Sequence, residues 1–143
     1  MSLKLTSFIQ IMDGRAKEAI EYYQEVLHAK VIFMQTLGEG PKHEVSKFEE
    51  NQLGLIAHSV LKIGDSEIMV SDIIPGVPFQ QGNQISICIT GSDISQTNQF
   101  YEKLKENGKI ILELRKIFFS PAYGMVTDKF GVTFQIFTTL EAK

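Results

Sequence analysis

The chain has one cysteine, no tryptophan and four prolines among its 143 residues. A single cysteine excludes an internal disulfide and a cluster of thiolate metal ligands. Cys88 lies within the apolar residues 85–89, and we expect a buried thiol there because free cysteine is among the most buried residue types. No apolar run approaches the roughly 20 residues that span a bilayer, and no long apolar segment of the signal-peptide kind begins the chain. We therefore expect a cytoplasmic protein with no membrane partner.

The chain also lacks an excess of positive charge. Its 14 basic residues against 17 acidic ones give a net charge of −3. Nucleic-acid affinity rests largely on neutralising phosphates with Lys and Arg, so we expect no nucleic-acid partner. With 43% hydrophobic and 22% charged residues, the composition is that of an ordinary globular protein, and a chain of this length can bury enough surface to fold as one domain.

The hydrophobic pattern alternates between the period of a strand and that of a helix. Ala16, Ala19, Ile20 and Tyr23 recur at three- and four-residue spacing, and Asp13 before them is a candidate N-cap. Residues 38–54 are charged and aperiodic, which predicts a mobile loop. For the first half of the chain, the patterns predict a helix at 16–27 and strands at 5–12, 30–37, 55–63 and 67–72.

A linker-like segment divides the chain near its middle. Residues 75–83 contain prolines, which remove backbone donors, and glycines, which relax the backbone dihedral angles. After this segment the same order of elements returns, with a helix at 93–107 and strands at 84–90, 109–113, 123–127 and 132–138. The sequence therefore predicts an α+β fold, a single domain made of two repeated βαβββ modules, about residues 1–74 and 83–143, joined by a Pro/Gly linker.

Several segments of this layout resemble one known family. They are AKEAIEYY at 16–23, HSVLKIG at 58–64, IMVSD at 68–72 and YGMVTDKFGV at 123–132. Together they resemble the PhnB-like branch of the glyoxalase/bleomycin-resistance, or vicinal oxygen chelate, superfamily, over nearly the whole chain. The resemblance implies a fold in which the two modules form an open barrel-like sheet that holds a small ligand, usually in a homodimer.

The resemblance also implies where the metal-dependent members of the superfamily hold their metal, on the first, fourth, fifth and eighth strands. This sequence has Phe8, Met69, Gln84 and Gln135 at those positions. A Phe ring and a Met thioether give no ligand to a hard or borderline cation, and Gln offers only a neutral amide oxygen. A shift of register would bring in Gln10, Glu67, Ser71 or Ser86, with a single carboxylate among them. We therefore expect no bound metal and no other cofactor.

Polar side chains on strand faces and at strand ends are the remaining candidates. His58 shares a strand face with Val60 and is the histidine best placed for a general base, with Asp72 or Glu67 to orient its ring. The alternatives are a hydrogen-bonded structural histidine, a turn-capping Asp72 and a packed Tyr123. The ligand-binding residues that we predict are Phe8, Gln10, His58, Met69, Ser71, Asp72, Gln84, Tyr123 and Gln135.

These residues favour a protein that binds a small organic molecule in a partly aromatic cavity, without a catalytic metal. Whether the chain catalyses a reaction stays open at this point. The alternatives that the resemblance implies are a metal-dependent lyase or dioxygenase, the 3-demethylubiquinone 3-methyltransferase of the family label, and a resistance protein that sequesters an antibiotic.

Overall fold

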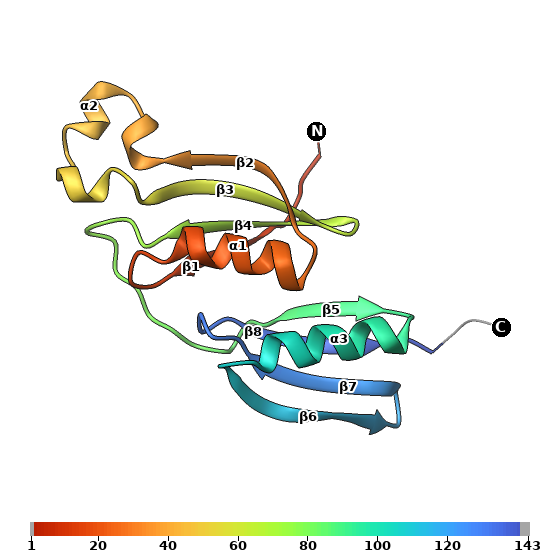
Figure 1. Ribbon diagram of the computed structural model, residues 1–143. Coiled ribbons are helices and arrows are strands. Elements are labelled where there is room, and N and C mark those ends of the chain that lie inside the picture. Colours follow the sequence, from red (N-terminus) through yellow and green to blue (C-terminus); the bar gives the residue numbers. More distant parts are fainter. Residues whose placement is uncertain (1, 141–143) are drawn as a thin grey trace. The chain divides into compact units, whose positions relative to one another are not determined.

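The computed structural model describes residues 2–140, and the chain divides into two compact units, residues 1–79 and 80–143. Each unit is a four-stranded sheet with a helix packed on one face (Figure 1). No helix within residues 2–140 is long and apolar enough to cross a membrane.

The first unit has the strand order β1-β4-β3-β2, in which β1 pairs parallel with β4 and the other pairs are antiparallel. Three short helical turns connect β2 to β3. The elements are β1 (Ser7–Ile11), α1 (Ala16–Val26), β2 (Lys30–Thr36), η1 (Leu37–Glu39), α2 (Lys42–Val45), η2 (Glu50–Gln52), β3 (Ile56–Ile63) and β4 (Ser66–Asp72).

The second unit has the equivalent order β5-β8-β7-β6, again with one parallel pair, β5 with β8. Its elements are β5 (Ile87–Gly91), α3 (Ile94–Lys105), β6 (Lys109–Ile117), β7 (Ser120–Thr127) and β8 (Thr133–Thr138). The predicted α+β fold with two βαβββ modules is confirmed.

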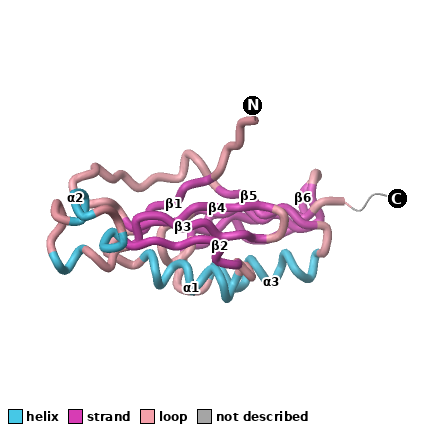
Figure 2. Tube along the Cα trace, turned by 90° about the horizontal axis from the view of Figure 1, so that it is seen from above, coloured by secondary structure: helices cyan, strands magenta, loops and turns pink. Residues whose placement is uncertain are grey.

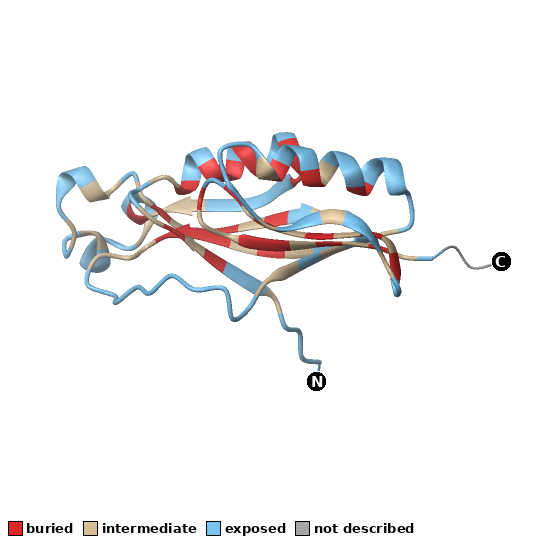
Figure 3. Cartoon of the chain, turned by 90° about the horizontal axis from the view of Figure 1, so that it is seen from below, coloured by how far each residue is buried: buried red, intermediate tan, exposed pale blue. Residues whose placement is uncertain are grey.

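Each helix covers one face of the sheet in its own unit. In Figure 2, α1 runs along one side of the strands of the first unit, and α3 does the same in the second. The buried residues of both helices lie on the side toward the strands (Figure 3). Tyr23 of α1 and Leu104 of α3 are fully buried there, opposite sheet residues such as Val70 and Ile136. Because strand side chains alternate, the residues between these buried positions form the other face of each sheet, which within residues 2–140 the helices of the same unit do not cover.

The start of α1 differs from the expectation. Asp13 is not the N-cap: it adopts a left-handed backbone with φ of 63°, followed by Gly14 with φ of 70°. Arg15 occupies the cap position, but its side chain does not cap the helix and instead donates from Nε to Glu18 at 3.1 Å. The buried carboxylate of Asp72, at the end of β4, instead accepts hydrogen bonds from Ala16 N–H at 2.9 Å and from Ile56 N–H at 2.8 Å. Asp72 therefore joins the helix start to β3.

The second unit uses hydroxyl groups at the same place. Thr138 ends β8 as Asp72 ends β4, and its Oγ1 lies 2.6 Å from Oγ1 of Thr97 on α3. The Ser120 hydroxyl, at the start of β7, donates to the Thr138 carbonyl at 2.6 Å. All three side chains are buried. The β7–β8 turn is held as its Asp-Lys-Phe-Gly sequence indicates, with Asp128 Oδ1 accepting from Phe130 N–H and Val132 N–H at 2.9 and 3.0 Å.

The segment between β2 and β3 is more ordered than a loop. Capping boxes stabilise the N-terminal ends of η1 and η2. Glu39 accepts hydrogen bonds from the Thr36 N–H and hydroxyl, each at 2.9 Å, and these bonds lower the pKa of Glu39. Gln52 accepts from Glu49 N–H at 2.8 Å. Hydrophobic periodicity does not reveal such turns, because side-chain bonds to the backbone rather than a buried stripe define them.

The edge strands β2 and β6 share an irregularity. In β2 the register skips one residue between Val31 and Phe33, and in β6 it skips one between Ile110 and Leu112. Each strand therefore carries a bulge, at Ile32 and at Ile111. These are the positions that the weak internal repeat of the sequence aligns.

Candidate functional site

The uncovered face of the first sheet carries a row of large apolar side chains. Phe8 of β1 pairs with Met69 of β4, Met69 with Val60 of β3, and Val60 with Phe33 of β2. Paired residues in adjacent strands point to the same side of a sheet. We call this surface face A. It is formed by the side chains Phe8, Gln10, Phe33, Gln35, His58, Val60 and Met69.

His58 lies between two phenylalanine rings on face A. Its imidazole stacks on Phe8 with ring centroids 5.9 Å apart, and it meets the tilted ring of Phe33 at 5.8 Å. Phe8 and Phe33 nevertheless remain 49% and 46% exposed. Two phenylalanine rings that both contact His58 and still face outward form with it an aromatic surface onto which a planar molecule can stack.

Neither Asp72 nor Glu67, the two carboxylates predicted to orient the His58 ring, forms a hydrogen bond with it. Both oxygens of Asp72 accept backbone N–H groups on the helix side of the sheet. Glu67 is paired with Lys4, whose Nζ lies 2.7 Å from its Oε1, and this hydrogen bond lowers the pKa of Glu67. Within residues 2–140, no hydrogen bond joins a carboxylate to the ring of His58, which acts here as a polar member of an aromatic surface.

The other predicted residues of the first unit fall into two groups. Met69 and Gln10 lie on face A, where Gln10 pairs with Ser71. Ser71 is buried, and its hydroxyl donates to the Asp72 carbonyl at 2.8 Å. Ser71 and Asp72 therefore maintain the end of β4, and the polar groups of face A come from Gln10, Gln35 and His58.

The second sheet has an equivalent uncovered surface, which we call face B. One row across the strands runs Cys88, Gln135, Met125 and Leu112, and the next includes Thr90, Phe137, Tyr123 and Arg115. These eight side chains and two neighbours, Ser86 and Phe119, make up face B.

Face B combines an aromatic cluster with a short chain of hydrogen bonds. Phe119 meets Tyr123 edge-on at 5.3 Å and Phe137 at 5.6 Å between ring centroids. The Tyr123 hydroxyl donates to Oε1 of Gln135, and Nε2 of Gln135 donates to the Ser86 hydroxyl at 2.8 Å. This chain fixes the orientation of the Gln135 amide beside the rings. Face B therefore presents apolar surface and ordered polar groups together, as ligand sites do.

The two faces place their polar centres at equivalent positions. Val60 and Met125 lie at equivalent positions in the rows of face A and face B. His58 precedes Val60 by two residues, and Tyr123 precedes Met125 by two residues. His58 pairs with Gln35, and Tyr123 pairs with Arg115. Arg115 was not among the predicted residues. The sequence signal for it was one of four charged residues in β6, which together interrupt the apolar pattern and made the strand look shorter than it is.

Two predictions about β5 are corrected. The strand begins at Ile87, so Gln84 precedes it and is exposed. The β5 residue paired with Gln135 is Cys88. Cys88 is also exposed, with its Sγ 3.6 Å from the Thr90 hydroxyl, so the expected buried thiol is wrong. The apolar run at 85–89 misled because β5 is an edge strand with one uncovered face.

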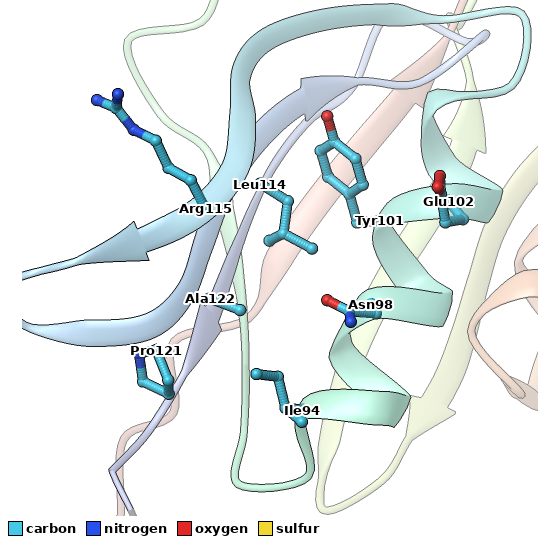
Figure 4. A pocket seen from close by; sticks show the side chains of 8 residues that line it. All are labelled: Ile94, Asn98, Tyr101, Glu102, Leu114, Arg115, Pro121 and Ala122. Carbon is cyan, nitrogen blue, oxygen red and sulfur yellow. The ribbon is translucent and has the colours of Figure 1, made fainter.

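A groove of about 450 Å³ lies elsewhere in the second unit, between α3 and the β6–β7 hairpin (Figure 4). Leu114 points into it toward Tyr101, whereas Arg115 points away from it. None of the predicted site residues lines this groove. Its lining residues are Ile94, Asn98, Tyr101, Glu102, Leu114, Arg115, Pro121 and Ala122.

Comparison with known proteins places the chain in a family. Residues 4–137 match the family model described as 3-demethylubiquinone-9 3-methyltransferase. The chain belongs to this family. Protein YjdN of Escherichia coli (strain K12) is 30% identical over 129 residues, which cover 86% of this chain and 87% of YjdN.

Solved structures show the fold that this family shares. A putative 3-demethylubiquinone-9 3-methyltransferase, PhnB protein, from Bacillus cereus has a TM-score of 0.75 at 22% identity, covering 96% of this chain and 100% of that one. A glyoxylase/bleomycin resistance protein/dioxygenase domain from Frankia sp. EAN1pec has a TM-score of 0.66 at 10% identity, covering 97% and 98% of the two chains. The chain has the glyoxalase/bleomycin-resistance fold and is PhnB-like.

The resemblance implies metal ligands on the first, fourth, fifth and eighth strands, and the side chains found there do not fit a divalent cation. On face A the expected positions hold Phe8 and Met69, which supply neither nitrogen nor oxygen. On face B, Gln84 precedes β5, and the β5 residue paired with Gln135 is Cys88, so this pair supplies a thiol and a neutral amide. Hard and borderline cations need carboxylate or imidazole ligands. Within residues 2–140, no three His, Cys, Asp or Glu side chains gather to form such a site.

Proposed function

We propose that this protein binds small organic molecules that carry an aromatic ring, with face A and face B each forming a binding surface in its own unit, and that it does so without a catalytic metal. The fold and the family match support a small-molecule site, and the side chains support its chemistry. Face A offers the Phe8, His58 and Phe33 rings, and face B offers Phe119, Tyr123 and Phe137.

One observation carries the proposal. Both repeats leave aromatic rings on the sheet face opposite the helix, and both set one polar ring, His58 or Tyr123, among them at the equivalent position. A sheet face that only had to be soluble would be polar, since contiguous exposed apolar patches are rare in soluble proteins and mark binding surfaces. The Tyr123, Gln135 and Ser86 chain adds fixed hydrogen-bonding groups beside the rings.

The same side chains argue against a metal-dependent lyase or dioxygenase. Such an enzyme needs a cation to polarise its substrate, and the four donor positions hold Phe8, Met69, Cys88 and Gln135. The residues of faces A and B can stack on a ring and donate or accept hydrogen bonds.

The binding test uses 2-naphthamide, a neutral aromatic probe, titrated into ¹⁵N-labelled protein and followed by backbone amide shifts. We expect saturable shifts at Phe8, His58, Tyr123 and Gln135. Asn98 and Tyr101, in the groove beside α3, should not move. Shifts confined to that groove, or none at all, would contradict the proposal.

Matched variants localise the binding to the aromatic rings. Phe119→Leu should weaken 2-naphthamide binding several-fold, because it removes ring contacts with Tyr123 and Phe137. Phe118→Leu is the control, since Phe118 is 97% exposed and contacts Phe119 edge-on. On face A, Phe33→Leu is matched by Met34→Leu on the opposite side of β2. Equal effects within both pairs would overturn the assignment to the faces.

The absence of a catalytic metal is tested separately. The purified protein is incubated with Fe²⁺, Mn²⁺ or Zn²⁺, desalted and analysed for bound metal. We expect far less than one equivalent of each. Stoichiometric metal that is lost in Gln135→Ala would contradict the metal-free proposal and favour a metal-dependent enzyme.

A further inference from the structure

Arg115 is a cation on face B that makes no ion pair with an acidic side chain within residues 2–140. Its strand position pairs with Tyr123, so its side chain emerges on the same side of the sheet as the Tyr123 ring. Figure 4 agrees, because the Arg115 side chain points away from the groove that Leu114 and Tyr101 line on the helix side. Within residues 2–140, no salt bridge or hydrogen bond joins its guanidinium to another side chain.

The acids near Arg115 in the sequence and in the neighbouring helix make no ion pair with it. On α3, Glu102 is bonded to Lys105, with Nζ 3.1 Å from Oε1, and that bond raises the pKa of Lys105. Within residues 2–140, no ion pair joins Glu113 of β6 to Arg115. None of the residues that form face B is an Asp or a Glu. The charge of Arg115 is therefore not compensated on its own face.

Arg115 is the group on face B best suited to bind an anion. The Tyr123 hydroxyl donates its only proton to Gln135 and has no donor left for a ligand, whereas the guanidinium presents donors in a planar fork that matches a carboxylate with two parallel hydrogen bonds. Thr90 adds a hydroxyl donor in the same row as Phe137 and Tyr123. Aromatic rings and a forked cation thus lie in one row.

We propose that Arg115 makes face B selective for an aromatic molecule that carries a carboxylate, with the ring on Phe119, Tyr123 and Phe137 and the carboxylate at the guanidinium. This inference rests on the proposed small-molecule binding and adds the charge of the ligand. Face A carries Gln35 at the position equivalent to Arg115, so the selectivity belongs to face B alone.

The test compares two probes that differ in charge and share a ring, 2-naphthoate and 2-naphthamide. With the wild-type chain we expect 2-naphthoate to bind about three- to tenfold more tightly, the range of one solvent-accessible charge-assisted contact. Raising the ionic strength from about 0.05 M to about 0.5 M should shrink this preference, since salt screens an exposed charge.

Three variants assign the preference to Arg115. Arg115→Gln places on face B the residue that face A has, and it should give the two probes equal affinity. Arg115→Lys keeps the charge and should retain part of the preference. Lys116→Gln removes the same charge from the adjacent exposed residue and should leave the preference unchanged.

The outcomes separate this inference from the proposed function. If both probes bind the wild-type chain equally, or if Lys116→Gln abolishes the preference and Arg115→Gln does not, Arg115 does not select the ligand and the aromatic site stands. If neither probe shifts a residue of face A or face B, the proposed function fails, and this inference fails with it.

Discussion

The two modules share a backbone plan and differ in the side chains that complete it. Both close with a parallel pair, β1 with β4 and β5 with β8, and both bulge at the equivalent point of the edge strand. Both helices are followed by a left-handed residue, His28 with φ of 57° and Asn107 with φ of 59°. Asp93 caps the start of α3 by accepting from Ser95 N–H at 2.9 Å, so both helix starts use a carboxylate. Yet the last strand of one module is joined to its helix by the carboxylate of Asp72 and that of the other by the hydroxyl of Thr138, and only the second module has an arginine on its uncovered face. The plan therefore tolerates different chemistry at equivalent points.

The largest expected effect is at the carboxylate of the first module. Asp72→Ala leaves the N–H groups of Ala16 and Ile56 without their acceptor in the protein interior, and each unsatisfied donor costs about 1 to 3 kcal/mol. We expect a loss of about 3 kcal/mol or more in the free energy of unfolding, measured by urea denaturation followed by circular dichroism. A loss below about 1 kcal/mol would show that water replaces the carboxylate and that the two modules are equally robust.

Substitution of the Thr97 and Thr138 hydroxyls in the second module should lower the free energy of unfolding by less, and the two changes should not be additive. Thr138→Val removes the shortest bond of the Thr97 hydroxyl, which keeps the Ile94 and Asp93 carbonyls at 3.2 and 3.3 Å, and it should cost about 1 kcal/mol. The double variant Thr97→Val, Thr138→Val removes both partners, so it should cost less than the two single changes together. Urea denaturation of the four chains gives this coupling energy. Strict additivity would contradict a direct hydroxyl-to-hydroxyl bond.

The residues after the two helices give a smaller contrast. A left-handed backbone is unfavourable for most side chains, tolerated by Asn and free for Gly. We expect His28→Gly to raise the free energy of unfolding by about 0.5 kcal/mol and Asn107→Gly to raise it by less. Thermal denaturation of both variants checks the order. The reverse order would mean that contacts of the His28 side chain outweigh the relief of its backbone.

The smallest effect concerns the ion pair between Lys4 and Glu67 in the first module. The Lys4 hydrogen bond lowers the pKa of Glu67 in the folded chain. This interaction therefore stabilises the folded state above the ordinary glutamate pKa of 4.5 and is lost as the pH falls through the lowered value. Lys4→Met should raise the pKa of Glu67 and remove that part of the acid dependence. Carboxyl NMR titration measures it, and an unchanged pKa would contradict the pairing.

Much of the fold can be predicted from the sequence, because apolar residues that alternate or recur every three to four residues indicate which side of each strand or helix is buried. The patterns predict the element order, the repeat and α1. They miss the end of β6, where Glu113 and Arg115 interrupt the apolar run, and the start of β5.

The candidate site can be predicted only in part from the sequence. Phe8, His58, Met69, Tyr123 and Gln135 lie on the two faces as their strand alternation indicates. Contacts between distant segments decide the rest: Asp72 meets the start of α1, 56 residues earlier, and Cys88 becomes the partner of Gln135 once β5 pairs with β8. No local pattern contains that information.

The paired bulges at Ile32 and Ile111 bear on how the protein stays in solution. Strands β2 and β6 are outermost in their sheets and expose apolar residues such as Phe33 and Leu112, the combination that invites uncontrolled joining of one sheet to another. One extra residue in the middle of such a strand shifts its backbone N–H and C=O groups out of register with a regular strand from another molecule. Deleting Ile32 or Ile111 would remove the bulge, and the regular edge strand that results could pair with a strand of another molecule and promote fibril growth.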